Sequence, residues 1–143
     1  MDLSFVITRK MLRFSNRIVN MRSERLQNFD LTPGQSETLQ FFCKNAGSTA
    51  TDLKGHLNIS HQAARNMAAR LMAKGLLSSS FSEEDGRSKR IFPTPEGERV
   101  YRALIADGSD AGEDLFSALS LPEKEELNRL LDKLNRVIEK ALQ

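Results

Sequence analysis

The chain has 143 residues, of which 39% are hydrophobic and 28% charged, a composition typical of a folded globular protein rather than a disordered one. Its longest apolar runs are a few residues, which excludes a membrane-spanning helix, and its N-terminal segment lacks the uninterrupted apolar region of a secretory signal. A single cysteine, Cys43, can form no internal disulfide, so we expect a protein of the reducing cytoplasm.

Charge is unevenly distributed along the chain, although the net charge is only +2. Residues 48–94 carry seven basic and four acidic side chains, a balance of +3, whereas residues 95–143 carry seven basic and eleven acidic ones, a balance of −4. This asymmetry is typical of a protein that presents a basic middle part to a polyanion.

The first part of the chain is predicted to be helical. Apolar residues recur at spacings of three and four over residues 3–28, which is the pattern of an amphipathic helix. Thr32 and Gln35 match a capping box around Pro33, and they predict that a second helix begins there and ends near Asn45.

Two further helices are predicted in close succession. Thr49 caps a short third helix, and Ser60 caps a fourth helix that runs to Lys74. Only residues 58–59 separate the two helices, so the pair is predicted to form a helix-turn-helix.

After the fourth helix the pattern changes to that of a hairpin. The residues that follow are too polar and too few for a helix, and Asp85-Gly86 predicts a tight turn because glycine supplies the positive φ that such turns require. Pro93 closes the second strand, and the next helix is predicted to begin at Thr94-Pro95. The hairpin is therefore a wing beside the helix-turn-helix.

The fourth helix has one narrow apolar side and one polar side. Its apolar side is made of Ala64, Met67, Ala68 and Leu71. On the polar side, arginine can bond guanine, and asparagine or glutamine can bond adenine, so this helix suits the major groove of DNA. The candidates for DNA contact in this half of the chain are Thr49, Ser60, His61, Gln62, Arg65 and Asn66.

Two short segments carry a family resemblance. Residues 85–87 are Asp-Gly-Arg, in the wing, and residues 94–97 are Thr-Pro-Glu-Gly, at the start of the next helix. With the order of the elements, they resemble the multiple antibiotic resistance regulator (MarR) family, whose signature has Asp-x-Arg in the wing and Leu-Thr-x-x-Gly after it. Pro93 stands where the family usually has leucine. The similarity spans essentially the whole chain.

The resemblance implies both a fold and a function. The fold is mainly α-helical with a small β-hairpin wing, in a single domain over residues 1–143. A winged helix-turn-helix lobe covers about residues 30–95, and dimerisation helices cover about residues 1–28 and 96–143. The function is that of a sequence-specific transcriptional regulator of double-stranded DNA: a homodimeric repressor at a pseudo-palindromic operator, released by a small-molecule effector.

The wing is the second expected DNA contact. In the family its arginine enters the minor groove and the acid two residues earlier braces it, which implies these roles for Arg87 and Asp85. A narrow minor groove concentrates negative potential and attracts arginine. We expect Lys89 and Arg90 to lie near phosphates and to position the protein without reading sequence.

The two ends of the chain carry more apolar surface than one small lobe can use. We expect these stripes to meet, and two interleaved copies would bury more of them than one copy, as in the family. Such a dimer presents two recognition helices about 34–36 Å apart, one turn of DNA. The expected dimerisation residues are Ile7, Met11, Phe14, Leu127, Leu131, Leu134 and Ile138.

The resemblance also implies an effector site. Family members often bind small phenolic or aromatic acids in a cleft between the DNA-binding lobe and the dimerisation helices. The candidates to line such a cleft are Arg13, Phe14, Arg17 and Phe42.

No other chemistry is indicated. Cys43 lies in an apolar helical pattern without an activating base, so we expect a packed core thiol rather than a redox sensor. His56 and His61 are the only histidines, and no metal-ligand spacing surrounds them. The sequence has no Ser/His/Asp set, phosphate loop or nucleotide fingerprint, so it predicts no enzyme, no metal and no cofactor.

One alternative from a different class stays open. A winged helix can serve as a protein-interaction or RNA-binding module, which would keep the capped helices but would not need Gln62, Arg65 and Arg87 together. The salt dependence of duplex binding separates the two, because neutralisation of phosphates gives a steep log–log slope.

Overall fold

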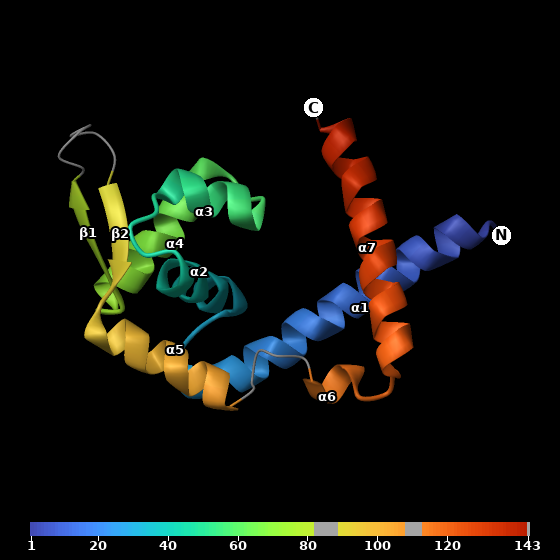
Figure 1. The fold of residues 1–143 in the computed structure, drawn as a ribbon, viewed down its shortest axis with the longest axis horizontal. Coiled ribbons are helices and arrows are strands. Elements are labelled where there is room, and N and C mark those ends of the chain that lie inside the picture. Colours follow the sequence, from blue (N-terminus) through green and yellow to red (C-terminus); the bar gives the residue numbers. More distant parts are fainter. Residues whose placement is uncertain (82–88, 108–112, 143) are drawn as a thin grey trace. The chain divides into compact units, whose positions relative to one another are not determined.

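The computed structural model describes residues 1–81, 89–107 and 113–142 of the chain. Within these ranges the protein is mainly helical and has one two-stranded antiparallel sheet, which confirms the predicted fold class (Figure 1). In chain order the elements are α1 (Leu3–Leu26), the 3₁₀ turn η1 (Gln27–Phe29), α2 (Pro33–Lys44), α3 (Ala50–Leu57), α4 (His61–Ala73), β1 (Leu77–Phe81), β2 (Lys89–Pro93), α5 (Pro95–Asp107), α6 (Glu113–Phe116) and α7 (Leu121–Ala141).

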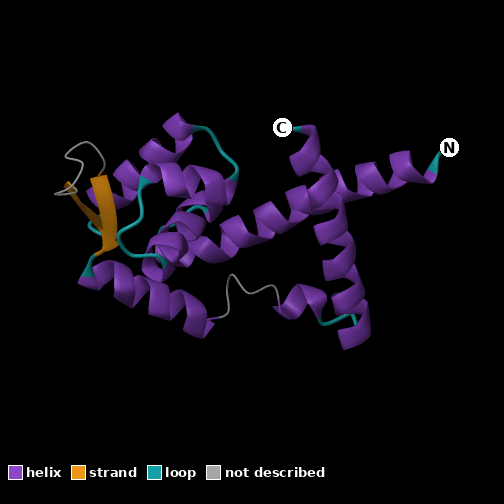
Figure 2. Ribbon diagram, turned by 45° about the horizontal axis from the view of Figure 1, so that its top comes forward, coloured by secondary structure: helices purple, strands orange, loops and turns teal. Residues whose placement is uncertain are grey.

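The chain divides into two compact units, Met1–Asp110 and Ala111–Gln143. The first unit contains α1 to α5 and the hairpin, which is the element drawn as strands in Figure 2. The second unit contains α6 and α7. None of the described helices is long and apolar enough to cross a membrane.

The predicted helix starts are confirmed by the hydrogen bonds that cap them. At the start of α2, the hydroxyl of Thr32 accepts from the main-chain N–H of Gln35, and the side chain of Gln35 accepts from the N–H of Thr32, both at 3.2 Å. The same reciprocal pair joins Thr49 and Asp52 at α3. These bonds satisfy N–H groups that have no partner inside the helix. The predicted N-caps confirmed by the structure are Thr32, Thr49 and Ser60, and Ser120 caps α7 in the same way.

The first helix ends slightly earlier than the apolar pattern predicts. It stops at Leu26 and tightens into η1, after which Asp30 adopts a left-handed conformation with φ of 54°. The N–H of Leu31 then donates to the carbonyl of Leu26 at 3.2 Å. A left-handed residue is a common way to end a helix, and aspartate tolerates this conformation better than most residues.

A single hydrophobic core lies between α2, α3, α4, α5 and the hairpin. From α4 it receives Ala64, Ala68 and Leu71, as predicted. Met67 was expected with them but is half-buried at the edge, where its sulfur accepts a hydrogen bond from the Thr38 hydroxyl at 3.4 Å. Among the largest fully buried side chains are Leu26, Leu39, Phe42, Leu53 and Leu71.

The turn between α3 and α4 is the predicted two-residue turn. Asn58 takes a left-handed conformation with φ of 58°, and the N–H of Ile59 donates to the carbonyl of Lys54 at 3.3 Å. Asparagine is one of the few residues that reach this conformation at low cost, so the turn can be short. The result is a helix-turn-helix.

The hairpin is fastened to the helices on both sides. Strand β2 pairs with β1, and its Ile91 also exchanges main-chain hydrogen bonds of 2.8 Å with residues 47–48 before α3. At the other end, the hydroxyl of Thr94 donates to the carbonyl of Gly75 at 2.6 Å and accepts from the N–H of Gly97 at 3.0 Å. The wing is therefore positioned by the α4–β1 turn and by the start of α5.

Candidate nucleic-acid interface

Side chains from α3, α4 and β2 surround a concave surface with a volume of about 620 Å³. This concavity lies along the exposed side of α4 and reaches as far as the buried Ala68. Six of the predicted DNA-contact residues line it, namely Thr49, His61, Gln62, Arg65, Asn66 and Lys89.

The concavity is positively charged. Arg65 from α4 and Lys89 from β2 are both exposed, and among the described residues that line it there is no carboxylate. A concave surface of one charge sign raises the local concentration of ligands of the opposite sign. The arrangement therefore suits an anionic ligand such as the DNA backbone.

The outer side of α4 presents groups that can read bases. His61, Gln62, Arg65 and Asn66 are all exposed and lie in the first two turns of the helix. The amide nitrogen of Gln62 donates to the side-chain oxygen of Asn66 at 3.0 Å. This bond orients both amides and uses only one of their four amide hydrogens, so both groups keep hydrogen-bonding capacity for base edges.

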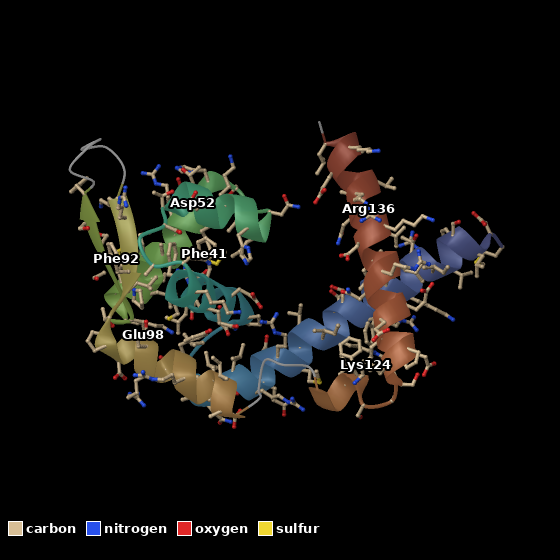
Figure 3. The ribbon with its side chains drawn as sticks, viewed as in Figure 1. Phe41, Asp52, Phe92, Glu98, Lys124 and Arg136 are labelled. Atoms are coloured by element: carbon tan, nitrogen blue, oxygen red, sulfur yellow. The ribbon has the colours of Figure 1, made fainter. Side chains whose placement is uncertain are left out.

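Thr49 is first of all a helix cap. Its hydroxyl donates to the carboxylate of Asp52 at 3.2 Å, and its N–H donates to the same oxygen at 2.9 Å; Asp52 is labelled in Figure 3. A hydroxyl has a single hydrogen, so a contact from Thr49 to a phosphate would have to break this bond. Thr51 also lines the concavity and was missed, although the run of hydroxyl residues around Thr49 was a signal for it.

Strand β2 of the wing places Lys89 and Arg90, both expected near phosphates, on opposite faces. Successive side chains of a strand point to opposite faces, so Lys89 shares a face with Ile91, and both line the concavity. The ammonium of Lys89 lies 5.6 Å from the ring centroid of Phe81. Arg90 is exposed, pairs with Ser80 in the register and belongs to the other face.

Two predicted contacts of the wing, Asp85 and Arg87, lie outside the described residues. Ser60 is placed at the start of α4, where its side chain accepts from the N–H of Ala63 at 3.1 Å. Its role in this structure is therefore that of a cap.

One effector candidate is incompatible with the structure. Phe42 has no exposed surface and packs in the core, so it cannot line a cleft open to a ligand. The apolar pattern of α2 placed it correctly on an inner side but could not show how completely its neighbours cover it. Arg13, Phe14 and Arg17 are exposed on α1.

Most of the predicted dimerisation residues are exposed. On α1, Ile7, Met11 and Phe14 have between 43% and 45% of their surface accessible. On α7, Leu131, Leu134 and Ile138 are between 40% and 55% accessible, and Leu127 is half-buried. We call Ile7, Met11 and Phe14 the α1 apolar face. We call Leu127, Leu131, Leu134 and Ile138 the α7 apolar face.

Cys43 is half-buried against the core, at its edge rather than inside it. Burial, together with the smaller effect of the carboxylate of Glu98 on α5, labelled in Figure 3, raises the pKa of its thiol from 9.0 to about 12. Below this pKa the thiol remains protonated, and a protonated thiol is a poor nucleophile. No group of three metal-ligating side chains occurs in the described part of the chain.

We expect alkylation of Cys43 by iodoacetamide at pH 8 to be far slower in the folded chain than in urea. A pKa three units higher lowers the thiolate fraction by about 1000-fold. Because the folded-state pKa is the higher one, this thiol favours folding below about pH 9 and loses that contribution as pH rises toward about 12. Equal alkylation rates in both states, followed by mass spectrometry, would contradict this assignment.

Comparison with known proteins agrees with this geometry. Residues 29–88 match a model of the MarR family. An HTH-type transcriptional regulator of Bacillus subtilis, YybA, which is itself uncharacterized, is 25% identical over 134 residues, which cover 94% of this chain and 89% of YybA.

Solved structures share the fold. A mutant of E. coli MarR complexed with operator DNA superposes with a TM-score of 0.83 at 25% identity, over 94% of this chain and 99% of that one. BpsR of Bordetella bronchiseptica, whose DNA binding is regulated by 6-hydroxynicotinic acid, superposes with a TM-score of 0.81 at 21% identity, over 90% and 98%. Over residues 29–88 the chain is therefore similar to the MarR family of DNA-binding transcriptional regulators, and it shares the fold of a solved member of that family.

Proposed function

We propose that the protein is a homodimeric repressor that recognises a pseudo-palindromic operator through α4 and the wing. The observation that carries this proposal is the positive concavity, which gathers Gln62, Arg65 and Lys89 from two elements onto one accessible surface. A protein-interaction module has no need to combine base-reading amides with two cations in one place. We propose the cytoplasm as its compartment, because an operator-binding regulator has to share a compartment with its DNA.

Each part of the interface has its own role in the proposal. Arg65 bonds a guanine and Gln62 an adenine in the major groove, with the Asn66 bond holding the amide of Gln62 in place. Lys89 neutralises a phosphate and contributes affinity without selectivity. Arg87 keeps its sequence-based role as the minor-groove contact of the wing.

The test compares Arg65→Ala with Lys89→Met on duplexes selected from a random pool. For Arg65→Ala we expect a loss of about 10- to 100-fold in discrimination at one base pair of each half-site. For Lys89→Met we expect uniformly weaker binding and a log–log salt slope reduced by about 1. Fluorescence anisotropy at several salt concentrations measures both quantities.

Lys124→Met is the matched control, because it removes one exposed lysine from α7, in the other unit (Figure 3). We expect it to leave discrimination and salt slope unchanged. Failure of the wild type to bind any duplex at low salt would exclude the proposed function and favour a protein-interaction or RNA-binding module.

The homodimer is proposed from the α1 and α7 apolar faces. Exposed faces of this kind on two long helices are typical of an interface that a second copy covers. A two-fold dimer would present two copies of α4 to successive turns of DNA, which accounts for a pseudo-palindromic operator.

A small aromatic or phenolic acid is proposed as the effector. The support is the similarity to the MarR family, the regulation of BpsR by 6-hydroxynicotinic acid, and the exposed guanidinium groups of Arg13 and Arg17 beside Phe14 on α1. Guanidinium groups suit a carboxylate, and a phenyl ring suits an aromatic ligand. Operator binding that stays unchanged across a panel of such acids would remove this part of the proposal.

A further inference from the structure

Lys74 holds the end of the recognition helix α4 to the segment that joins α1 to α2. It is the C-cap residue of α4. Its ammonium group donates to the main-chain carbonyl of Asp30 and, at 3.2 Å, to the side-chain oxygen of Gln35. These partners lie 44 and 39 residues away in sequence, so the contact joins two distant parts of the first unit.

The acceptor groups on the α1–α2 side are themselves fixed. The Gln35 oxygen also accepts from the N–H of Thr32 and so belongs to the capping box of α2, and only 7% of Gln35 is exposed. Asp30 is held in its left-handed conformation between η1 and α2. Lys74 therefore contacts a rigid junction and not a mobile side chain.

The carboxylate of Asp30 is not the important partner. It lies 3.6 Å from the ammonium group, but its side chain is 97% exposed, whereas that of Lys74 is 31% exposed. Exposed ion pairs contribute little because water screens them. The two hydrogen bonds to the main chain and to Gln35 are the specific contacts.

The same junction is tied to α1. Arg22 of α1 donates to the carboxylate of Glu37 on α2 at 2.7 Å. Helix α2 therefore bonds to α1 through Glu37 and to Lys74 through Gln35, and α1 also carries the α1 apolar face. The C-terminal end of α4 is thereby connected, through α2, to α1, the helix that would contact the second copy.

We propose that Lys74 is a positioning residue that sets the half-site spacing accepted by the dimer, and not a phosphate contact. This inference rests on the proposed function. Helix α4 has 13 residues and is therefore about 20 Å long. A tilt of about 10° around one end of the helix moves the other end by about 3.4 Å, which is one base-pair step of DNA. The Lys74 contact at the C-terminal end of α4 therefore adds to the core packing of this helix in setting its tilt, and a small change of tilt is enough to change the spacing.

The test measures binding to three operators that carry the selected half-sites at the selected spacing, one base pair closer and one base pair farther. For Lys74→Met we expect the preference for the selected spacing to fall about tenfold, while the salt slope and the affinity for random duplex stay as in the wild type. For Lys89→Met we expect the opposite pattern, with the spacing preference kept and the salt slope reduced by about 1.

Two further variants sharpen the comparison. Lys74→Arg keeps a cationic donor and should restore most of the preference. Asp30→Asn removes only the exposed negative charge and keeps a residue that tolerates the left-handed conformation, so it should change nothing. If Lys74→Met does not fold, Lys74→Gln replaces it with the same expected loss of spacing preference.

The outcomes separate this inference from the proposed function. An unchanged spacing preference in Lys74→Met, or a salt slope reduced by about 1, would show that Lys74 is not a positioning residue, while operator recognition itself would stand. A wild type with selective binding but no spacing preference would overturn the inference alone. A wild type that binds no duplex would overturn both.

Discussion

Replacing Gly97 with alanine is expected to lower the free energy of unfolding by about 3 kcal/mol. A Cβ atom at this position would lie 2.0 Å from the carbonyl oxygen of Leu76 and 3.0 Å from its carbonyl carbon. Both atoms belong to the backbone, so relief requires the start of α5 to move away from the α4–β1 turn. That movement would break the hydrogen bonds through which Thr94 joins the two segments. Urea unfolding at constant m-value measures the loss.

Gly55→Ala is the matched control for this change. Gly55 lies inside α3, and no atom is within 4 Å of the position that its Cβ would occupy. Alanine is the better helix former, so we expect a gain of about 0.5–1 kcal/mol. If the two variants were equally stable, the close approach of α5 to Leu76 would not be what requires glycine at position 97.

Placing a charge on the α7 apolar face is expected to separate the dimer. In Leu134→Glu, a carboxylate would have to be buried against the second copy, and the dimer would have to dissociate to keep it hydrated. A monomer holds one half-site at a time, so we expect operator affinity to fall by about 100-fold or more. Light scattering after gel filtration and anisotropy on the operator measure the two effects.

Asn128→Glu adds the same charge to the same helix. At 100° per residue it lies about 120° around α7 from Leu134 and about 90° from the centre of the α7 apolar face, so it is at the edge of this face rather than on it. We expect this variant to remain dimeric and to bind the operator as the wild type does. If Leu134→Glu also stayed dimeric, the α7 apolar face would not be the dimer interface.

Much of the fold was predictable from the sequence because the decisive contacts are local. The Thr32–Gln35 and Thr49–Asp52 capping boxes join residues three positions apart, so they can be found by reading a few letters of sequence. The two-residue turn at Asn58 has the same property, since it depends on one residue that tolerates a left-handed conformation. The helical period of α4 also placed Gln62 and Arg65 correctly on its exposed side.

Contacts between distant segments were beyond the sequence patterns. Helical periodicity gives the side of a helix but not the depth of burial, so it left Phe42 among the effector candidates although α2 holds it fully inside the core. The alternation of side chains along a strand predicts that Lys89 and Arg90 lie on opposite faces of β2. It does not predict which face is turned toward α4, and the concavity shows that this is the face of Lys89.

The sequence by itself therefore determined where the helices and strands begin, which faces are apolar, and that the middle of the chain is basic. The tertiary structure alone decided that Lys74 points to the α1–α2 junction, that Gly97 lies against Leu76, and that the Cys43 thiol is held protonated. The physical reason is the separation in sequence between the residues that interact. Caps and turns depend on neighbours within four residues, whereas these three properties depend on backbone and side chains that only folding brings together.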